Sequence, residues 1–135
     1  MSHLFDSGSE KPMNTDIAYS ANVLTTACHL ASKRAGWWEN INPRDPYVIA
    51  TKLMLAVSEL AEAMEGARKG LKDDKLLEKE MLEVELADCV IRVFDLAGAL
   101  GYSDFGGTLA AKMAYNATRV DHKKESREAE GGKKF

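Results

Sequence analysis

The apolar residues of the chain recur at intervals of three and four along most of its length, which is the spacing of helices that each bury one face. The pattern predicts an all-α protein with four helices, over about residues 15–35, 46–69, 73–100 and 103–124. The residues expected to form the buried faces of the first three helices are Ile17, Val23, Leu24, Ala27, Leu30 and Ala31, then Leu53, Val57, Leu60 and Met64, then Met81, Val84, Ala87, Ile91 and Phe94.

Residues that start and stop helices mark the second helix best. Asp45 can cap it, Pro46 suits its first position, and Gly70 is a typical residue just beyond a helix end. The acids Asp73 and Asp74 favour a start of the third helix at that point. The connection is then so short that the two helices must lie antiparallel, which predicts a helical hairpin within a four-helix-bundle-like fold.

The domain organisation follows from where the helical pattern begins and ends. Residues 1–14 are expected to form a flexible N-terminal arm, residues 15–124 one helical domain, and residues 125–135 an exposed tail. All three prolines lie at or before Pro46, so the remainder is free of helix-breaking residues of that kind. A length of 135 residues fits a single domain.

Charge and composition narrow the function classes. The net charge of −3 argues against a protein that binds a nucleic acid polymer, because affinity for many phosphates needs concentrated Lys and Arg. No apolar run approaches the roughly 20 residues that cross a bilayer, so no membrane role is expected. The N-terminus lacks the order of a secretory signal, and Cys28 and Cys89 are expected to be reduced thiols. We therefore expect a cytoplasmic protein.

Two pairs of acids carry the candidate chemistry. Glu59 and Glu62 are three residues apart, as are Glu85 and Asp88, so each pair lies on one helix face. Both pairs are equally far from a point between residues 73 and 74, so an antiparallel hairpin brings all four carboxylates to one level. Carboxylates so close repel one another unless a cation binds, and Mg²⁺ or Mn²⁺ accepts an all-oxygen shell. Arg92, one turn beyond Asp88, is expected to be a salt-bridge partner.

The fourth predicted helix adds a polar stripe. Lys112, Asn116 and Arg119 are spaced four and three residues apart and would share a face. The ammonium of lysine, the amide of asparagine and the planar guanidinium of arginine all bind phosphate oxygens. Beside an acidic metal cluster, this stripe indicates a polyphosphate site.

These motifs together resemble the all-α nucleoside triphosphate pyrophosphohydrolases, and specifically the single-domain MazG-like proteins of phages and bacteria. The resemblance covers about residues 20–135. It is carried by GWW at 36–38, KLMLAVSELAEAMEGARKG at 52–70, ELADCVIRVFDLAG at 85–98, KMAYNATR at 112–119 and GGKKF at 131–135.

The resemblance implies cleavage of a (deoxy)nucleoside triphosphate into a monophosphate and pyrophosphate. By analogy with the family, dGTP or GTP is the first candidate substrate. Glu59, Glu62, Glu85 and Asp88 would hold Mg²⁺ or Mn²⁺, with Glu59 or Glu62 as the catalytic base. It also implies a homodimer or homotetramer. The residues then expected to contact the nucleotide are Lys112, Asn116 and Arg119 for phosphates, Lys133 and Lys134 for phosphates of a neighbouring subunit, and Trp37 and Trp38 as walls for the base.

Other interpretations stay open from the sequence. The substrate could instead be dCTP, dUTP or a broad set of nucleotides. A di-iron helical bundle would use Glu-x-x-His pairs, and His3, His29 and His122 all fall outside the acid motifs. A non-catalytic helical partner module would predict that Glu62→Gln leaves function intact.

Overall fold

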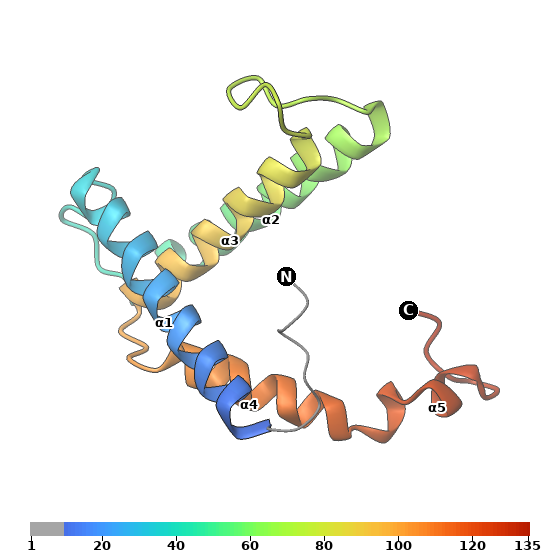
Figure 1. Cartoon of the computed structure of the whole chain (residues 1–135). Helices are drawn as coiled ribbons and strands as arrows, with labels where there is room; N and C mark the ends of the chain where they lie inside the picture. The colour runs from blue at the N-terminus through green and yellow to red at the C-terminus, as the bar shows by residue number, and fades with distance from the viewer. Residues whose placement is uncertain (1–9) are drawn as a thin grey trace. The chain divides into compact units, whose positions relative to one another are not determined.

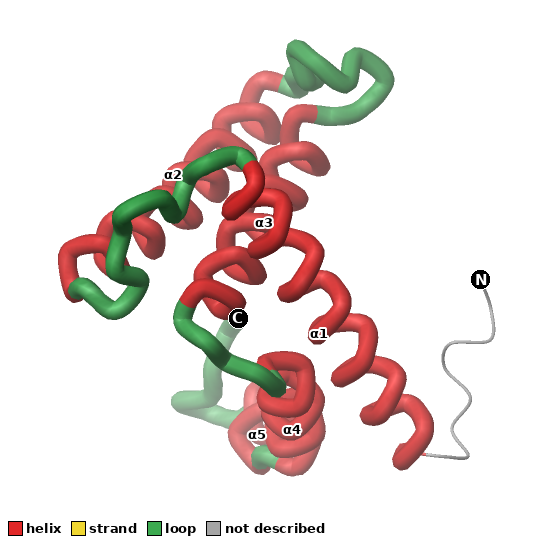
Figure 2. Tube along the Cα trace, turned by 90° about the vertical axis from the view of Figure 1, so that its left-hand side faces the viewer, coloured by secondary structure: helices red, strands yellow, loops and turns green. Residues whose placement is uncertain are grey.

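The computed structural model describes residues 10–135, and all regular structure in that range is helical (Figure 2). The all-α prediction is therefore confirmed for the described residues. No helix among them combines the length and apolarity that a membrane span requires. The elements are α1 (Glu10–Arg34), α2 (Pro46–Lys69), α3 (Met81–Ala99), α4 (Phe105–Thr118), the 3-10 turn η1 (Val120–His122) and α5 (Lys124–Glu128).

The chain divides into two compact units. One comprises Val23–Ser103 and holds the second part of α1 together with α2 and α3. The other comprises Met1–Asn22 and Asp104–Phe135, and its described part holds the first part of α1, α4, η1 and α5. Helix α1 begins at Glu10, so residues 10–14 of the predicted arm are helical, while residues 1–9 lie outside the described range.

Helix α2 has the ends that the sequence predicts. The Asp45 carboxylate accepts hydrogen bonds from the backbone N–H of Tyr47 at 2.8 Å and of Val48 at 3.4 Å, and Pro46 is the first helical residue. Gly70 ends the helix with a φ of 61°, a left-handed conformation that glycine adopts without steric cost. These signals are local, which explains why they could be predicted.

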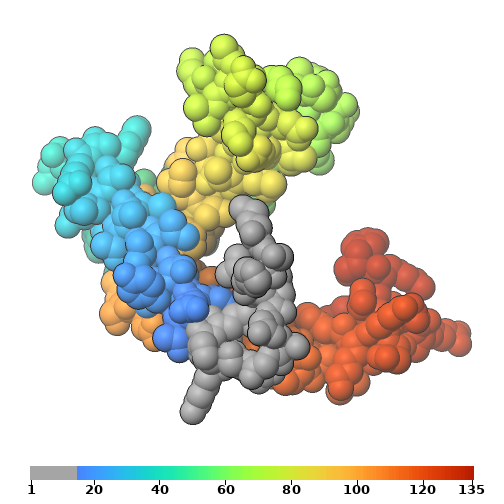
Figure 3. Space-filling model, viewed as in Figure 1, coloured from blue at the N-terminus to red at the C-terminus, as the bar shows by residue number. Residues whose placement is uncertain are grey.

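Helix α3 begins at Met81, and the predicted start at Asp73 or Asp74 is wrong. Asp73 instead accepts hydrogen bonds from the N–H groups of Lys75 and Leu76, and its own N–H bonds the carbonyl of Lys79. An isolated bridge between Lys72 and Glu80 closes the connection, which forms the rounded end of the hairpin (yellow-green in Figure 3). The acid at position 73 therefore stabilises a structured loop, where the sequence suggested a helix start.

The register of the hairpin is nevertheless the predicted one. Helices α2 and α3 run side by side and antiparallel (Figure 1). Gly66 faces Met81 so closely that a Cβ at position 66 would lie 2.8 Å from the Met81 Cβ. Gly66 and Met81 are equally far from the point between residues 73 and 74 on which the two acid pairs centre. The acid pairs are therefore level with each other although the loop is longer than expected.

The predicted buried face of α2 is exposed in the single chain. Leu53, Val57, Leu60 and Met64 are 53%, 49%, 48% and 58% exposed, so the assignment of this stripe to the chain's own core is wrong. Helix α2 packs on α3 with another face, which contains Glu59, Ala63 and Gly66. Helical periodicity identifies the apolar stripe correctly but does not say which surface covers it.

Other predicted core positions are exposed as well. In α1, Val23, Leu24 and Leu30 are exposed, and in α3 Ile91 is exposed. The side chains of Ile17, Met81, Val84 and Phe94 are half-buried. In the described range, the buried apolar residues are Trp38, Leu96 and four alanines, which are Ala21, Ala63, Ala97 and Ala110.

In the second unit, Asn22 of α1 joins the start of α4. Its Nδ2 donates to the Asp104 carboxylate at 3.0 Å, and its Oδ1 accepts the N–H of Gly106 at 2.7 Å. Asp104 also caps α4 through the N–H of Gly107. Helix α4 ends at Thr118, before the predicted end near Lys124, because the backbone of Arg119 is extended.

The predicted exposed tail is partly structured. Residues 124–128 form the short helix α5, after which the chain turns back (Figure 1). The Nζ of Lys133 lies 2.7 Å from the Asp121 carboxylate, which also receives the Arg119 guanidinium at 2.7 Å. These ion pairs hold the pKa of Asp121 well below its usual range, with the hydrogen bond from Arg119 as the largest cause.

Candidate functional site

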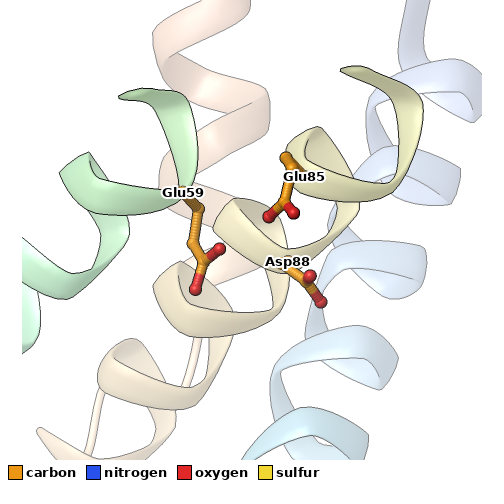
Figure 4. A group of neighbouring side chains, drawn as sticks. All are labelled: Glu59, Glu85 and Asp88. Atoms are coloured by element: carbon orange, nitrogen blue, oxygen red, sulfur yellow. The ribbon is translucent and has the colours of Figure 1, made fainter. Parts of the chain in front are cut away.

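Three of the four predicted carboxylates converge between α2 and α3. Oxygen atoms of Glu59, Glu85 and Asp88 all lie within 4.8 Å of one another. Figure 4 shows Glu59 reaching from α2 toward α3, where Glu85 and Asp88 sit one turn apart. Glu59 and Glu85 are only 7% and 9% exposed. We refer to Glu59, Glu85 and Asp88 as the carboxylate cluster.

Glu62, the fourth predicted acid, lies at the edge of the carboxylate cluster. Its residue is exposed, and its carboxyl group interacts with those of both Glu59 and Glu85. The structure thus brings all four predicted acids together while giving them different surroundings. Three of them face one another, and Glu62 keeps access to solvent.

The close approach of these acids shifts their pKa values in different directions. Burial, the neighbouring Glu59 and Glu62 carboxyls and their negative charges raise the pKa of Glu85 to about 7. Burial and the charge of Glu59 also raise the pKa of Asp88. Burial works to raise the pKa of Glu59, but hydrogen bonds from Arg92 and from the Glu85 and Glu62 carboxyls outweigh it and lower that pKa. Near neutral pH the cluster therefore holds a proton on Glu85 or needs a compensating positive charge.

The donor set fits a hard divalent cation. Oε2 of Glu85 is buried and has no hydrogen-bond partner, although a buried carboxylate oxygen without one is costly. A cation at the centre of the carboxylate cluster would satisfy this oxygen and neutralise the repulsion. An all-carboxylate set suits Mg²⁺ or Mn²⁺, and the cluster contains no histidine.

Arg92 stabilises the cluster from α3. Its Nε donates to Oε1 of Glu59 at 2.7 Å. The predicted salt bridge of Arg92 is therefore present, but its partner is Glu59 on the facing helix, while Asp88 is its neighbour on the same helix. The guanidinium fixes the Glu59 carboxylate in an ionised form.

A cavity of about 760 Å³ adjoins the carboxylate cluster within the Val23–Ser103 unit. Its volume lies in the range of small-molecule sites, which is about 300–1,000 Å³. Small side chains of α1 make one wall, and α2 and α3 make the others. Its charged lining residues are Lys52, Glu59, Asp88, Arg92 and Asp95, and its other lining residues include Ala27, Cys28, Ala31, Ser32, Ala35, Trp37, Leu55 and Ile91.

The two neighbouring tryptophans differ in their surroundings. Trp37 is 66% exposed and lines the cavity, so its indole face is available to a flat ligand. Trp38 is buried, and its Nε1 donates to Oδ1 of Asp95 at 2.9 Å, while the Lys52 ammonium lies 4.5 Å from its ring centre. The geometry suits a wall for a base at Trp37 and a structural role for Trp38.

Substitutions at these two positions should therefore differ in effect. Trp38→Phe should lower the free energy of unfolding by about 1–3 kcal/mol, because it removes a donor from a half-buried carboxylate. Trp37→Ala should change that free energy by less than about 0.5 kcal/mol, as expected for an exposed side chain. Denaturant unfolding of the two variants measures both values, and a larger loss for Trp37→Ala would contradict the assignment.

The predicted phosphate-binding residues lie in the second unit. Lys112 and Asn116 are on α4, where the Lys112 ammonium lies over the Tyr115 ring and Oδ1 of Asn116 is buried without a hydrogen-bond partner. Arg119 follows the end of α4, so it does not extend the helical stripe as predicted. Arg119 and Lys133 both pair with Asp121, and Lys134 is exposed. Their contacts with phosphate stay a prediction.

Lys52 and Asp95 are site residues that the motifs did not identify. Lys52 lines the cavity from α2, and Asp95 lines it from α3. A signal for Asp95 exists in the sequence, because it follows Asp88 by seven residues and Arg92 by three, which places it on the same helix face. Cys28 and Cys89 are both free and half-buried. Burial, and to a lesser extent the negative charge of Asp95, raises the pKa of Cys28.

Comparison with known proteins adds no family to this picture. No protein-family model, curated protein or solved structure matches the chain.

Proposed function

We propose that the protein is a metal-dependent hydrolase that cleaves a nucleoside triphosphate into a monophosphate and pyrophosphate. The observation that carries this proposal is the carboxylate cluster, with its unpartnered Glu85 oxygen, at the wall of a cavity large enough for a nucleotide. Cations and an exposed indole in the same lining suit a ligand with phosphates at one end and a flat base at the other. The MazG-type bundle and the preference for dGTP or GTP belong to this proposal.

The residues of the cluster have separable roles in this reaction. Glu59, Glu85 and Asp88 would hold Mg²⁺ or Mn²⁺, which supplies positive charge for phosphate oxygens and lowers the pKa of water. Glu62 is the better candidate for the base that accepts a proton from the attacking water, since its carboxylate is exposed. Glu59 is the poorer candidate because Arg92 already occupies one of its oxygens.

The site of attack can be tested by isotope labelling. Hydrolysis in ¹⁸O-water should place the label in the monophosphate, because attack on the α phosphorus expels pyrophosphate unlabelled. Mass spectrometry of both products measures this. Label in pyrophosphate, or release of orthophosphate, would contradict the proposed reaction.

Metal binding should depend on pH in a definite direction. A proton on Glu85, whose pKa is about 7, competes with the cation, so affinity for Mn²⁺ should fall as the pH drops below 7. Displacement of one proton predicts a loss approaching tenfold per pH unit between about pH 6.5 and 5.5. Calorimetric titration with Mn²⁺ at several pH values measures the slope, and a constant affinity from pH 8 to 5.5 would show that Glu85 does not bind the ion.

The surroundings of the histidines disfavour the di-iron alternative. Among the described residues, no histidine joins the group of acids that could hold a metal, and His29 instead lies 2.9 Å from Asp95 Oδ1. His3 lies outside the described residues. The non-catalytic partner module gains support only from the exposed stripe on α2, for which an assembly of identical chains gives a sufficient explanation.

The exposed stripe on α2 is part of the proposal, as the contact surface for a second copy of this chain. Leu53, Val57, Leu60 and Met64 alternate at intervals of four, three and four, the spacing of a coiled-coil seam. The seam contains no charge. A two-fold pairing would place the same seam of each copy against the other, as symmetric dimers require.

Helix α3 extends this apolar surface. At about 100° per residue, its exposed Leu86, Val90 and Val93 fall on the same side of the hairpin as the α2 stripe. Covering these half-exposed side chains in both copies gives on the order of 10–20 kcal/mol of gross hydrophobic stabilisation. That gain is at or above the upper part of the range of about 4–15 kcal/mol estimated for the entropic cost of association.

A further inference from the structure

The lining of the cavity beside the carboxylate cluster contains a further carboxylate, that of Asp95, which is not part of the cluster. Asp95 follows Asp88 by seven residues on α3, which corresponds to two helical turns or about 10 Å along the axis. Both residues line the same cavity. If the phosphates of a nucleotide lie at the carboxylate cluster, Asp95 is placed where the base would lie.

Asp95 is held in one orientation by two side chains behind it. Its Oδ1 accepts the Trp38 Nε1–H at 2.9 Å and lies 2.9 Å from His29 Nδ1. Because a carboxylate oxygen only accepts, the second contact selects the histidine tautomer with its proton on Nδ1. The His29 and Trp38 rings meet edge to face, with centroids 5.9 Å apart. Gly98, one turn after Asp95, lets His29 approach α3 closely.

This arrangement leaves acceptor capacity for a ligand. Both fixed contacts engage Oδ1, and the Asp95 side chain is only 13% exposed. The guanidinium of Arg92, one turn away, is engaged with Glu59. A half-buried carboxylate of this kind is stabilised by N–H donors and destabilised by a carbonyl oxygen in the same place.

We infer that Asp95 selects nucleotides whose base carries an exocyclic amino group. It disfavours bases that have a carbonyl at the position of that amino group, and bases that lack the amino group. Guanine, cytosine and adenine present such donors, and carboxylates accept from base amino groups in known recognition. Uracil presents a carbonyl where cytosine has its amino group, and hypoxanthine lacks the amino group of guanine. This inference rests on the proposed function, since it takes the cavity to hold a nucleotide.

Binding of monophosphates tests the inference without any need for catalysis. Calorimetry with the full-length protein should show dCMP bound more tightly than dUMP, and dGMP more tightly than dIMP, by about 10- to 100-fold. Asp95→Asn should reduce both ratios to within about threefold, because an amide can accept from Trp38 and also donate to a carbonyl. Asp74→Asn, an exposed acid in the hairpin loop, should leave both ratios unchanged.

Each outcome decides the matter. Unchanged ratios in Asp95→Asn, tighter binding of dUMP or dIMP, or no binding of any of the four monophosphates would overturn the inference. If the expected ratios are found while no triphosphate is cleaved, the base selection stands and the proposed reaction fails. If triphosphates are cleaved while the ratios stay near one, the reaction stands and Asp95 is not the selecting residue.

Discussion

Glu85→Gln should reduce turnover by about 10³-fold and at the same time stabilise the metal-free protein by about 1 kcal/mol at pH 8. The loss follows from removing one carboxylate from the set that holds the cation, which supplies several kcal/mol of transition-state stabilisation. The gain follows because glutamine removes a buried charge from the neighbourhood of Glu59 and Glu62 and can donate a hydrogen bond to Glu59.

The pH dependence of this stability gain has a definite sign. The pKa of Glu85 is raised from 4.5 to about 7, so the folded protein retains a proton that the unfolded chain releases. The metal-free wild type therefore loses stability as the pH rises from about 4.5 through 7, and Glu85→Gln should not show that part of the loss. Thermal unfolding from pH 5 to 8, with and without Mg²⁺, measures it.

Glu83→Gln provides a matched control for this experiment. Glu83 lies two residues earlier on α3, is exposed and pairs with Lys79 at 3.3 Å. The control should change both turnover and the free energy of unfolding little. Full activity of Glu85→Gln, or a loss of stability at pH 8 in the absence of metal, would remove Glu85 from the metal site.

Leu60→Glu should convert the proposed dimer into single chains. Leu60 lies in the middle of the apolar stripe on α2 and is already about half exposed, so the fold of one chain tolerates a polar residue there. In a symmetric dimer, the change would bury two negative charges without partners, which weakens association by at least about 100-fold. Sedimentation equilibrium of wild type and variant measures the mass directly.

Leu77→Glu is the matched control for the stripe. Leu77 lies in the hairpin loop and is 69% exposed, so the same substitution is made outside the seam. The control should keep the assembled mass. A monomeric wild type, or a Leu60→Glu variant with unchanged mass, would show that the stripe is not the contact between copies.

Local signals explain which parts of the fold could be predicted. The ends of α2 follow from a capping aspartate, a proline and a glycine, each of which acts on its own few residues. The register of the hairpin could be predicted because residues equally far from the point between residues 73 and 74 face each other. This relation holds although the loop is longer than expected. The start of α3 could not be predicted. Asp73 has the residue type of a helix start, but its hydrogen bonds with Lys75, Leu76 and Lys79 hold it in a loop.

The candidate site shows the same division. The four acids could be predicted because their spacing along two helices determines that they meet. Two features depend on side-chain packing between helices. Arg92 of α3 pairs with Glu59 of α2, and Trp37 and Trp38 have different surroundings. The covering of the α2 stripe could not be predicted from periodicity, which identifies an apolar face but not its partner.

We expect Glu59, Glu85 and Asp88 to hold a cation that serves the release of pyrophosphate from a nucleotide. The most direct measurement is incubation of the wild-type protein and Glu85→Gln with each of the eight standard ribo- and deoxyribonucleoside triphosphates, with Mg²⁺, Mn²⁺ or a chelator, followed by quantification of monophosphate and pyrophosphate. We expect equal amounts of both products from at least one of these nucleotides, only with metal, and about 10³-fold more slowly with Glu85→Gln than with the wild type. No cleavage of any triphosphate by the wild type with either ion, or equal cleavage by Glu85→Gln, would contradict it.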